Sequence, residues 1–235
     1  NLANEYFNYT HPYGQWKDTG IRLEGDAVCS LTVTFLEMWN AISDKDTNDL
    51  DFKKYICHPE YKACQTGFVQ PYADSPMDNE QVGEEVYISM INKAEKDEMT
   101  HALCLAAKRG VDVRIITPGI PDKKFIYSIT RSFYHGLVKH GVRIYEWAPG
   151  FCHAKMSVAD DCMATCGTIN LDYRSLYHHF ENGCFMADCQ AVIQIRDDLT
   201  RIIKECRDVT DQYRTGRSAY LRLGQLFMRL FAGLL

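Results

Sequence analysis

The feature that most constrains the fold of this 235-residue chain is a unit that occurs twice in a row. The stretches 106–119 ("AAKRGVDVRIITPG") and 137–150 ("LVKHGVRIYEWAPG") each pass from a helical pattern through two basic residues and a glycine into a β-branched run and a Pro-Gly turn. Glycine after a helix is the usual left-handed stop, and β-branched residues favour strands. Two consecutive helix–strand units predict an α/β sheet.

Other elements are expected on both sides of these units. An amphipathic helix is predicted at 28–39 and a polar linker at 44–51. The stretch 71–76 ("PYADSP") indicates an ordered loop, because the residue before each proline is held away from helical backbone angles. Further strands are predicted at 151–158, 162–167 and 184–187.

After residue 187 the pattern becomes helical, at 197–213 and again at 217–234. In the second stretch the apolar residues fall on one face, with arginines around it. That pattern is typical of two arrangements, a terminal helix docked on the core and a helix lying at a membrane surface. The sequence is compatible with both.

The composition indicates one large folded domain, since 46% of the residues are hydrophobic and 24% are charged. A net charge of −5 argues against a general nucleic-acid binder, while the acid-free, arginine-bearing tail after residue 213 points to an anionic partner. Ten cysteines spread singly indicate a reduced compartment. No apolar run approaches the ~20 residues that span a bilayer.

The stretch 151–158 carries a histidine and a lysine two residues apart. On a strand, side chains alternate between two faces. The polar face then holds His153, Lys155 and Ser157, and the apolar face holds Cys152, Ala154, Met156 and Val158. His153 and Lys155 would lie ~7 Å apart, so that both could reach one phosphate-sized anion. An isolated histidine on a strand is more often a structural residue whose hydrogen bonds are satisfied within the protein. The residues around His153 instead favour a catalytic role.

The neighbours are polar groups that follow on the next turn, "GTINLDYRS" at 167–175. Gly167 permits close backbone approach, while Thr168 and Asn170 supply groups able to bond phosphate oxygens. A carboxylate on one imidazole nitrogen would leave the other nitrogen of His153 for chemistry, and Glu181 is the candidate.

The spacing H-A-K-x4-D, followed by "GTINLDYRS", resembles the HxKxxxxD signature of the phospholipase D superfamily. Asp160 matches the aspartate of the signature, but it falls out of phase with His153 and forms a turn with Asp161, so its role is predicted to be structural. The stretches 16–25, 68–76 and 131–151 also resemble the C-terminal half of a bacterial cardiolipin synthase. The resemblance implies an α/β fold: a phospholipase D-like mixed sheet flanked by helices, with C-terminal amphipathic helices.

In that family two motifs face each other across a pseudo-two-fold axis. One histidine attacks phosphorus and forms a phosphohistidine, while the other protonates the leaving alcohol and activates the incoming one. The resemblance implies transfer of a phosphatidyl group from one phosphatidylglycerol to another with release of glycerol, without metal or other cofactor. It makes His153 the general acid/base, Lys155, Thr168 and Asn170 phosphate ligands, and Glu181 the carboxylate that orients the histidine.

The implied partners are anionic phospholipids (phosphatidylglycerol and cardiolipin) and the membrane surface, with no nucleic acid. The implied location is the cytoplasmic face of the cell membrane, as a peripheral part, with any membrane-spanning segments upstream of Asn1.

The first residues, "NLANEY", resemble the close of the first motif, which would place the first His-x-Lys upstream of Asn1. The predicted organisation is a remnant of the first motif region at 1–25, a helix and linker segment at 26–80, and a phospholipase D-like domain at 81–235 with its motif at 148–175. The chain would then hold half an active site, to be completed by a missing N-terminal half or a second copy. The family normally has a strand between such a Lys96 and Asp97, whereas here the helical pattern runs straight on, so either that strand is missing from these residues or the sheet is rearranged.

Two alternatives to the synthase are a hydrolase of the same superfamily and an inactive membrane-docking fragment. Tyr72 is interpreted as a pocket or core residue, Trp147 as core, and His178 with His179 as a transition from surface to core. Four cysteines near the motif lack the paired spacing of zinc ligands: Cys152, Cys162, Cys166 and Cys184.

Overall fold

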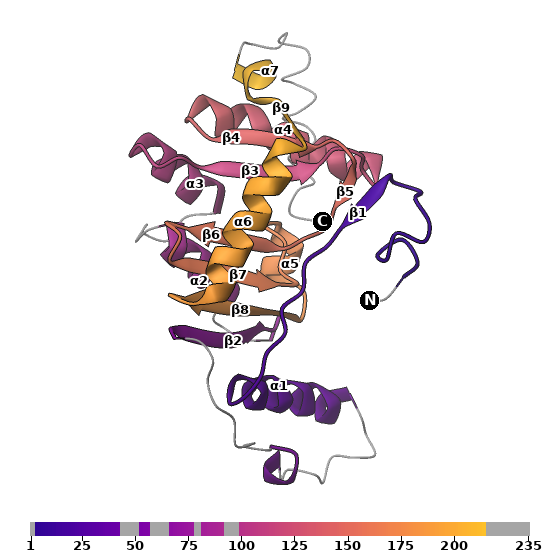
Figure 1. Ribbon diagram of the computed structural model, residues 1–235, viewed down its shortest axis with the longest axis vertical. Coiled ribbons are helices and arrows are strands. Elements are labelled where there is room, and N and C mark those ends of the chain that lie inside the picture. The colour runs from indigo at the N-terminus through magenta and orange to yellow at the C-terminus, as the bar shows by residue number, and fades with distance from the viewer. Residues whose placement is uncertain (1–2, 43–51, 57–65, 78–80, 92–98, 215–235) are drawn as a thin grey trace.

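The structure of the protein is a computed structural model, which describes residues 3–42, 52–56, 66–77, 81–91 and 99–214 (Figure 1). The helices are α1 (Ala27–Ile42), α2 (Val82–Ile91), α3 (Met99–Lys108), α4 (Lys124–Lys139), α5 (Tyr173–Tyr177), α6 (Gln190–Lys204), α7 (Thr210–Arg214) and the 3₁₀ helix η1 (Phe52–Lys54). The strands are β1 (Gln15–Lys17), β2 (Phe68–Asp74), β3 (Arg114–Pro118), β4 (Arg143–Trp147), β5 (Gly150–Cys152), β6 (Met156–Ala159), β7 (Met163–Gly167), β8 (Glu181–Ala187) and β9 (Cys206–Asp208).

The two repeated units form as predicted. Helix α3 leads through Gly110 (φ 93°) into β3, and helix α4 leads through Gly141 (φ 102°) into β4. Both glycines adopt the left-handed conformation that side chains disfavour. Strands β3 and β4 pair in parallel, with Arg114 opposite Arg143. The α/β class is therefore confirmed.

The strands are divided between two main sheets. One has the order β2-β8-β7-β6 and is antiparallel throughout, and the other has the order β3-β4-β9 with one parallel and one antiparallel pairing. Strands β1 and β5 form a separate parallel pair. Helix α6 contacts strands of both sheets and crosses them in Figure 1. The expected mixed sheet flanked by helices is present, but it is split.

The split leaves the edge strands β3 and β6 in the middle of the molecule (Figure 1). Their neighbours are well buried, since Ile144–Trp147 of β4 and Ala164–Cys166 of β7 are all in the core. By contrast, every residue of β6 is only half-buried, and Thr117 is the buried residue of β3. Strands β3 and β6 therefore lie at the centre of the fold but are as exposed as edge strands.

Three sequence predictions are corrected by strand pairing. The strand at 151–158 is interrupted at 153–155, because β5 pairs with β1 whereas β6 pairs with β7. The helix at 197–213 is α6, then β9, then α7, because residues 206–208 pair with β4. The loop at 71–76 is largely strand β2, whose place at a sheet edge tolerates Pro71.

The remaining predicted elements are partly testable. The helix at 28–39 and the strands at 162–167 and 184–187 are confirmed by α1, β7 and β8. Three predictions lie outside the described residues: the helix at 217–234, the linker at 44–51 and the junction between Lys96 and Asp97.

Candidate active site

His153 lies directly after β5, where the N-terminal segment runs alongside it. The backbone N–H of His153 donates to the carbonyl of Lys17 at 2.7 Å, which continues the β1–β5 pairing by one residue. This places Asp18 beside the imidazole, and His153 Nδ1 lies 2.9 Å from Asp18 Oδ2. A carboxylate at Nδ1 fixes the tautomer with the proton there, so Nε2 is left as the atom for chemistry.

The Asp18 carboxylate is held in its charged form. Burial opposes ionisation, but hydrogen bonds from His153 and from the backbone N–H of Thr19, with the charge interaction with His153, outweigh it and lower the pKa of Asp18 below its ordinary value. Trp16 Nε1 adds a longer contact at 3.4 Å. Asp18 is therefore an anionic partner for the imidazole at neutral pH.

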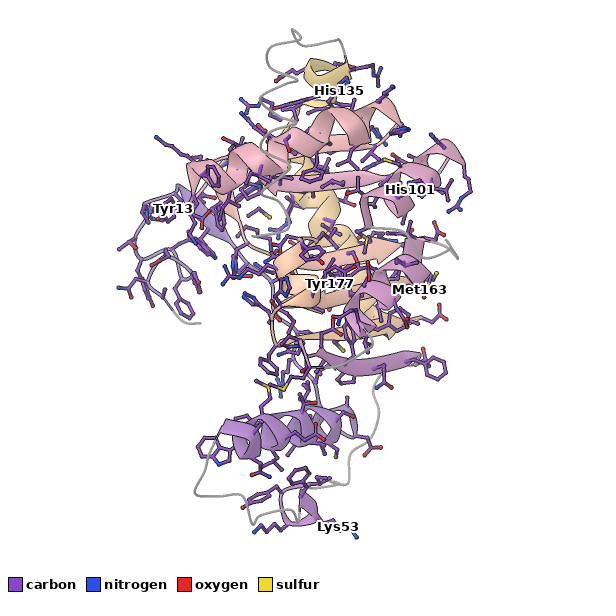
Figure 2. All side chains as sticks on the ribbon, turned by 180° about the vertical axis from the view of Figure 1, so that it is seen from behind. Tyr13, Lys53, His101, His135, Met163 and Tyr177 are labelled. Atoms are coloured by element: carbon purple, nitrogen blue, oxygen red, sulfur yellow. The ribbon has the colours of Figure 1, made fainter. Side chains whose placement is uncertain are left out.

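Three aromatic rings surround His153. The ring centroids of Tyr6, Trp16 and Phe151 lie 5.6, 5.2 and 5.9 Å from the centroid of the imidazole. Tyr6 also stacks on Trp16 at 4.5 Å. Figure 2 labels Tyr13 in the same N-terminal segment, and its ring lies 6.3 Å from that of Phe151. The imidazole is thus restrained by packing as well as by Asp18.

Lys155 is brought next to His153, although not by a continuous strand. Its Nζ donates to the carbonyl oxygen of His153 at 2.6 Å. Burial lowers the pKa of Lys155, while the carboxylates of Asp18, Glu181 and Asp172 act in the opposite direction. A partly desolvated ammonium among these groups is suited to bind an anion that displaces its carbonyl partner.

The polar groups of the turn after β7 hydrogen-bond to one another and to the start of β8. Gly167 packs so tightly that a Cβ built there would lie 2.3 Å from the carbonyl of Asn182. The hydroxyl of Thr168 donates to Glu181 and accepts from the backbone N–H of Asn182 at 3.0 Å. Asn170 Nδ2 lies 3.3 Å from Ser175 Oγ. Thr168 would have to release Glu181 before it could donate to a phosphate.

The expectation that Glu181 holds His153 does not fit these contacts. The two oxygens of Glu181 contact Thr168 and His179, the second at 3.3 Å to Nδ1. His179 Nε2 accepts from Arg174 Nε at 2.8 Å. The carboxylate on His153 is Asp18, because the β1–β5 pairing brings the N-terminal segment to Nδ1.

Asp160 has the turn geometry that its sequence position indicates. Asp160 and Asp161 have φ of 48° and 57°, and the N–H of Cys162 donates to the carbonyl of Ala159 at 3.2 Å. Two central residues with positive φ characterise the tight hairpin turn between antiparallel strands. The structure thus accounts for Asp160 as the residue that turns β6 into β7.

The other candidates have ordinary surroundings. Trp147 is buried at 4% exposure and donates from Nε1 to Glu205 at 3.0 Å, which confirms it as core. Tyr72 packs beside a buried cluster, and burial raises its pKa. Among the described residues, no group of three or more His, Cys, Asp or Glu side chains is placed to hold a metal ion.

Asp18 was not predicted from the sequence. One signal could have identified it, because Asp18-x-Gly20 and Glu181-x-Gly183 follow the same pattern at a spacing of about 163 residues. In each case a helix begins nine residues after the acidic residue, α1 at Ala27 and α6 at Gln190. An internal comparison would have marked Asp18 as the counterpart of Glu181.

Solved structures with the same fold define the class. Phosphatidylserine synthase of Haemophilus influenzae Rd KW20 matches 71% of this chain and 47% of its own with a TM-score of 0.53 and 15% identity. Nuc of Salmonella typhimurium, a phospholipase D family member, matches 61% of this chain and 98% of its own with a TM-score of 0.50 and 17% identity. The chain has a phospholipase D-like fold.

Sequence relatives narrow this class. The chain belongs to the family described as "Cardiolipin synthase, PLD-like domain", which matches residues 80–203. A protein of Streptococcus mutans serotype c, described as "Uncharacterized protein", is 43% identical over 247 residues, covering all of this chain and 53% of the relative. Cardiolipin synthase of Clostridium perfringens strain SM101 is 32% identical over 249 residues, covering all of this chain and 52% of the enzyme.

The chain therefore spans about half the length of these relatives, corresponding to their C-terminal half. The alignment to the S. mutans relative extends over 247 positions and the chain has 235 residues, so at least 12 positions of the alignment are gaps in this chain. Within the described residues, no helix has the length and apolar character needed to cross a bilayer.

Proposed function

We propose that this chain carries the second half-site of an enzyme that makes cardiolipin by transferring a phosphatidyl group from one phosphatidylglycerol to another. The observation that supports this most strongly is the pair formed by Asp18 and His153, with Lys155 beside it. It provides an oriented imidazole with Nε2 available and an ammonium to hold a phosphate oxygen. No metal or other cofactor is needed for this chemistry.

In the proposed reaction, His153 acts as general acid and then as general base. His153 begins the cycle as the imidazolium, with a proton on each ring nitrogen. A histidine from the other motif attacks phosphorus, and the bond from phosphorus to the head-group glycerol oxygen breaks as His153 Nε2–H protonates that oxygen, which leaves His153 as the neutral Nδ1–H tautomer. Glycerol leaves, and Nε2 then takes the proton from the hydroxyl of a second phosphatidylglycerol. That oxygen displaces the phosphohistidine nitrogen, so protons balance over the cycle.

Lys155 and Asn170 are proposed to bind phosphate oxygens, with Thr168 joining them once its hydroxyl leaves Glu181. Negative charge grows on these oxygens in the transition state, and a charged donor in a partly desolvated site stabilises it. Glu181 is proposed to orient the histidine of the other motif, since Asp18, its counterpart ahead of this motif, already holds His153. The substrates would be drawn from an anionic membrane surface.

The test reconstitutes the whole site. The chain is fused behind the half that precedes the matched region in the C. perfringens cardiolipin synthase, and the protein is incubated with phosphatidylglycerol vesicles. Cardiolipin and glycerol in equal amounts are expected, and His153→Ala should reduce the rate by ~10³-fold or more. Phosphatidic acid without cardiolipin would identify a hydrolase, and a fully active His153→Ala protein would refute the role of His153.

A further inference from the structure

The short sheet that brings Asp18 to His153 has little support from its own hydrogen bonds. Strands β1 and β5 have three residues each and, among the residues that the structure describes, pair only with each other. A two-stranded pair of this size is marginal in water. The rings of Trp16 and Phe151, with centroids 4.8 Å apart, hold the strands together, but Asp18 lies one residue beyond the end of β1. Its position therefore depends on a further contact.

Lys17 makes that contact, because it bonds to the backbone of both members of the Asp18–His153 pair. Its carbonyl accepts from the N–H of His153 at 2.7 Å, and its Nζ donates to the carbonyl of Asp18 at 3.2 Å. In an extended chain, consecutive side chains point to opposite sides. The Lys17 side chain therefore leaves the strand on the side away from the imidazole, while its two hydrogen bonds fix the backbone from which the Asp18 carboxylate projects.

Asp198 on α6 holds the Lys17 ammonium in this place. Asp198 Oδ2 lies 2.7 Å from Lys17 Nζ, and the two side chains are 20% and 21% exposed. Burial opposes ionisation of Asp198, but hydrogen bonds from Lys17 and Arg201 outweigh it and lower the pKa of Asp198. Helix α6 contacts strands of both main sheets, and Figure 1 shows the chain leaving β1 alongside it. The ion pair thus ties the segment that carries Asp18 to the framework of the fold.

We infer that Lys17 and Asp198 are positioning residues for catalysis: their ion pair holds the backbone of Asp18 so that its carboxylate stays on His153. For its effect on turnover this rests on the proposed function. Lys17 is not assigned to the substrate phosphate, because its ammonium already has a carboxylate partner on the α6 side of the strand. A partly buried ion pair is screened less than an exposed one, which suits it to hold a fixed geometry.

The test is Asp198→Ala in the 235-residue chain, with the Asp18 carboxyl titrated by carbon-detected NMR. Two effects of this substitution have opposite signs. Removal of a nearby negative charge, acting through space alone, would lower the pKa of Asp18. Loosening of Asp18 from His153 would raise it, because the contact with His153 contributes a hydrogen bond and a charge interaction that lower it. A rise is expected, and a fall or no change would overturn the inference.

Asp197→Ala is the matched control. Asp197 is the neighbouring residue on α6, is 65% exposed, and pairs with Arg196 of the same helix as Asp198 pairs with Arg201. The control removes the same charge and a similar ion pair from the helix without touching Lys17. It should leave the pKa of Asp18 unchanged. The same rise in both variants would point to a general effect of α6 and would contradict the role of Lys17.

In the reconstituted enzyme, Asp198→Ala should lower kcat by about 10- to 100-fold and change KM little, because misplacement of the group that orients His153 acts on the transition state. A higher KM with kcat retained would make Lys17 a substrate contact and would overturn the inference. Because the Asp18 titration needs no turnover, a fusion that makes no cardiolipin would count against the proposed function alone.

Discussion

Asp18 Oδ2 lies 2.9 Å from His153 Nδ1, across 135 residues of sequence. The contact depends on the parallel pairing of β1 with β5, because that pairing carries Asp18 to the end of the strand from which His153 projects. Orientation of the His153 imidazole is thus a property of the N-terminal segment as much as of the motif.

The first prediction concerns this pair. In the wild-type chain the carboxyl of Asp18 titrates below its ordinary pKa, and His153→Ala should raise that pKa because it removes a hydrogen bond and a charge interaction. The stabilisation from Asp18 is present above the unfolded-state pKa and is lost as pH falls through the lowered folded-state pKa. Carbon-detected NMR titration of the side-chain carboxyl measures this. An unchanged Asp18 titration in the variant would contradict the pairing.

In the reconstituted enzyme, Asp18→Asn should lower kcat by ~10²- to 10⁴-fold, because the amide favours the wrong tautomer of His153. Substrate binding should change little. Glu181→Gln provides the comparison: it should also reduce turnover, but in the chain alone it should leave the Asp18 titration unchanged, since Glu181 contacts Thr168 and His179.

A second prediction concerns Lys155. Burial lowers its folded-state pKa below the unfolded value, so the unfolded chain binds more protons between these two pKa values and stability rises with pH there. Wild type should therefore gain free energy of unfolding relative to Lys155→Met as pH increases towards 10. Urea denaturation of both proteins at several pH values tests this, and parallel pH profiles would refute it.

Lys155→Met should also lose binding of inorganic phosphate, measured by ³¹P NMR.

A third prediction contrasts a buried and an exposed carboxylate, each bonded to two arginines. Glu146 is fully buried and pairs with Arg131 and Arg207, while Asp112 is half-exposed and pairs with Arg114 and Arg143. Glu146→Ala should cost ~2–3 kcal/mol of unfolding free energy, because it removes charge-assisted hydrogen bonds that a buried carboxylate makes inside the core. Asp112→Ala should cost less than about 1 kcal/mol. Chemical denaturation measures both, and similar losses would show that burial does not set the difference.

A fourth prediction tests the split sheet. Amide hydrogen exchange should be faster in β3 and β6 than in their buried neighbours β4 and β7, because each has one edge that no described residue pairs with. Exchange followed by NMR resolves the individual amides. Equal protection in all four strands would mean that a further strand or segment covers the edges.

Much of the fold follows from local sequence. Gly110 and Gly141 end α3 and α4 because glycine adopts positive φ without steric cost, and the β-branched runs after them form β3 and β4. Asp160 and Asp161 form the predicted turn for a similar reason, since aspartate tolerates that conformation better than most residues. These features depend on neighbours in the chain.

What only the tertiary structure decided is which distant segments meet. The strand at 151–158 breaks because its two ends pair with different strands, and His153 bonds to Asp18 because β1 lies along β5. Residues 206–208 form β9 within a helical pattern because β4 offers them hydrogen-bond partners. Sequence by itself determined the two helix–strand units, the Asp160–Asp161 turn and the motif, since these arise from short-range sterics and periodicity. Pairing and burial are long-range, and they decided which carboxylate bonds to His153 and which segments form strands.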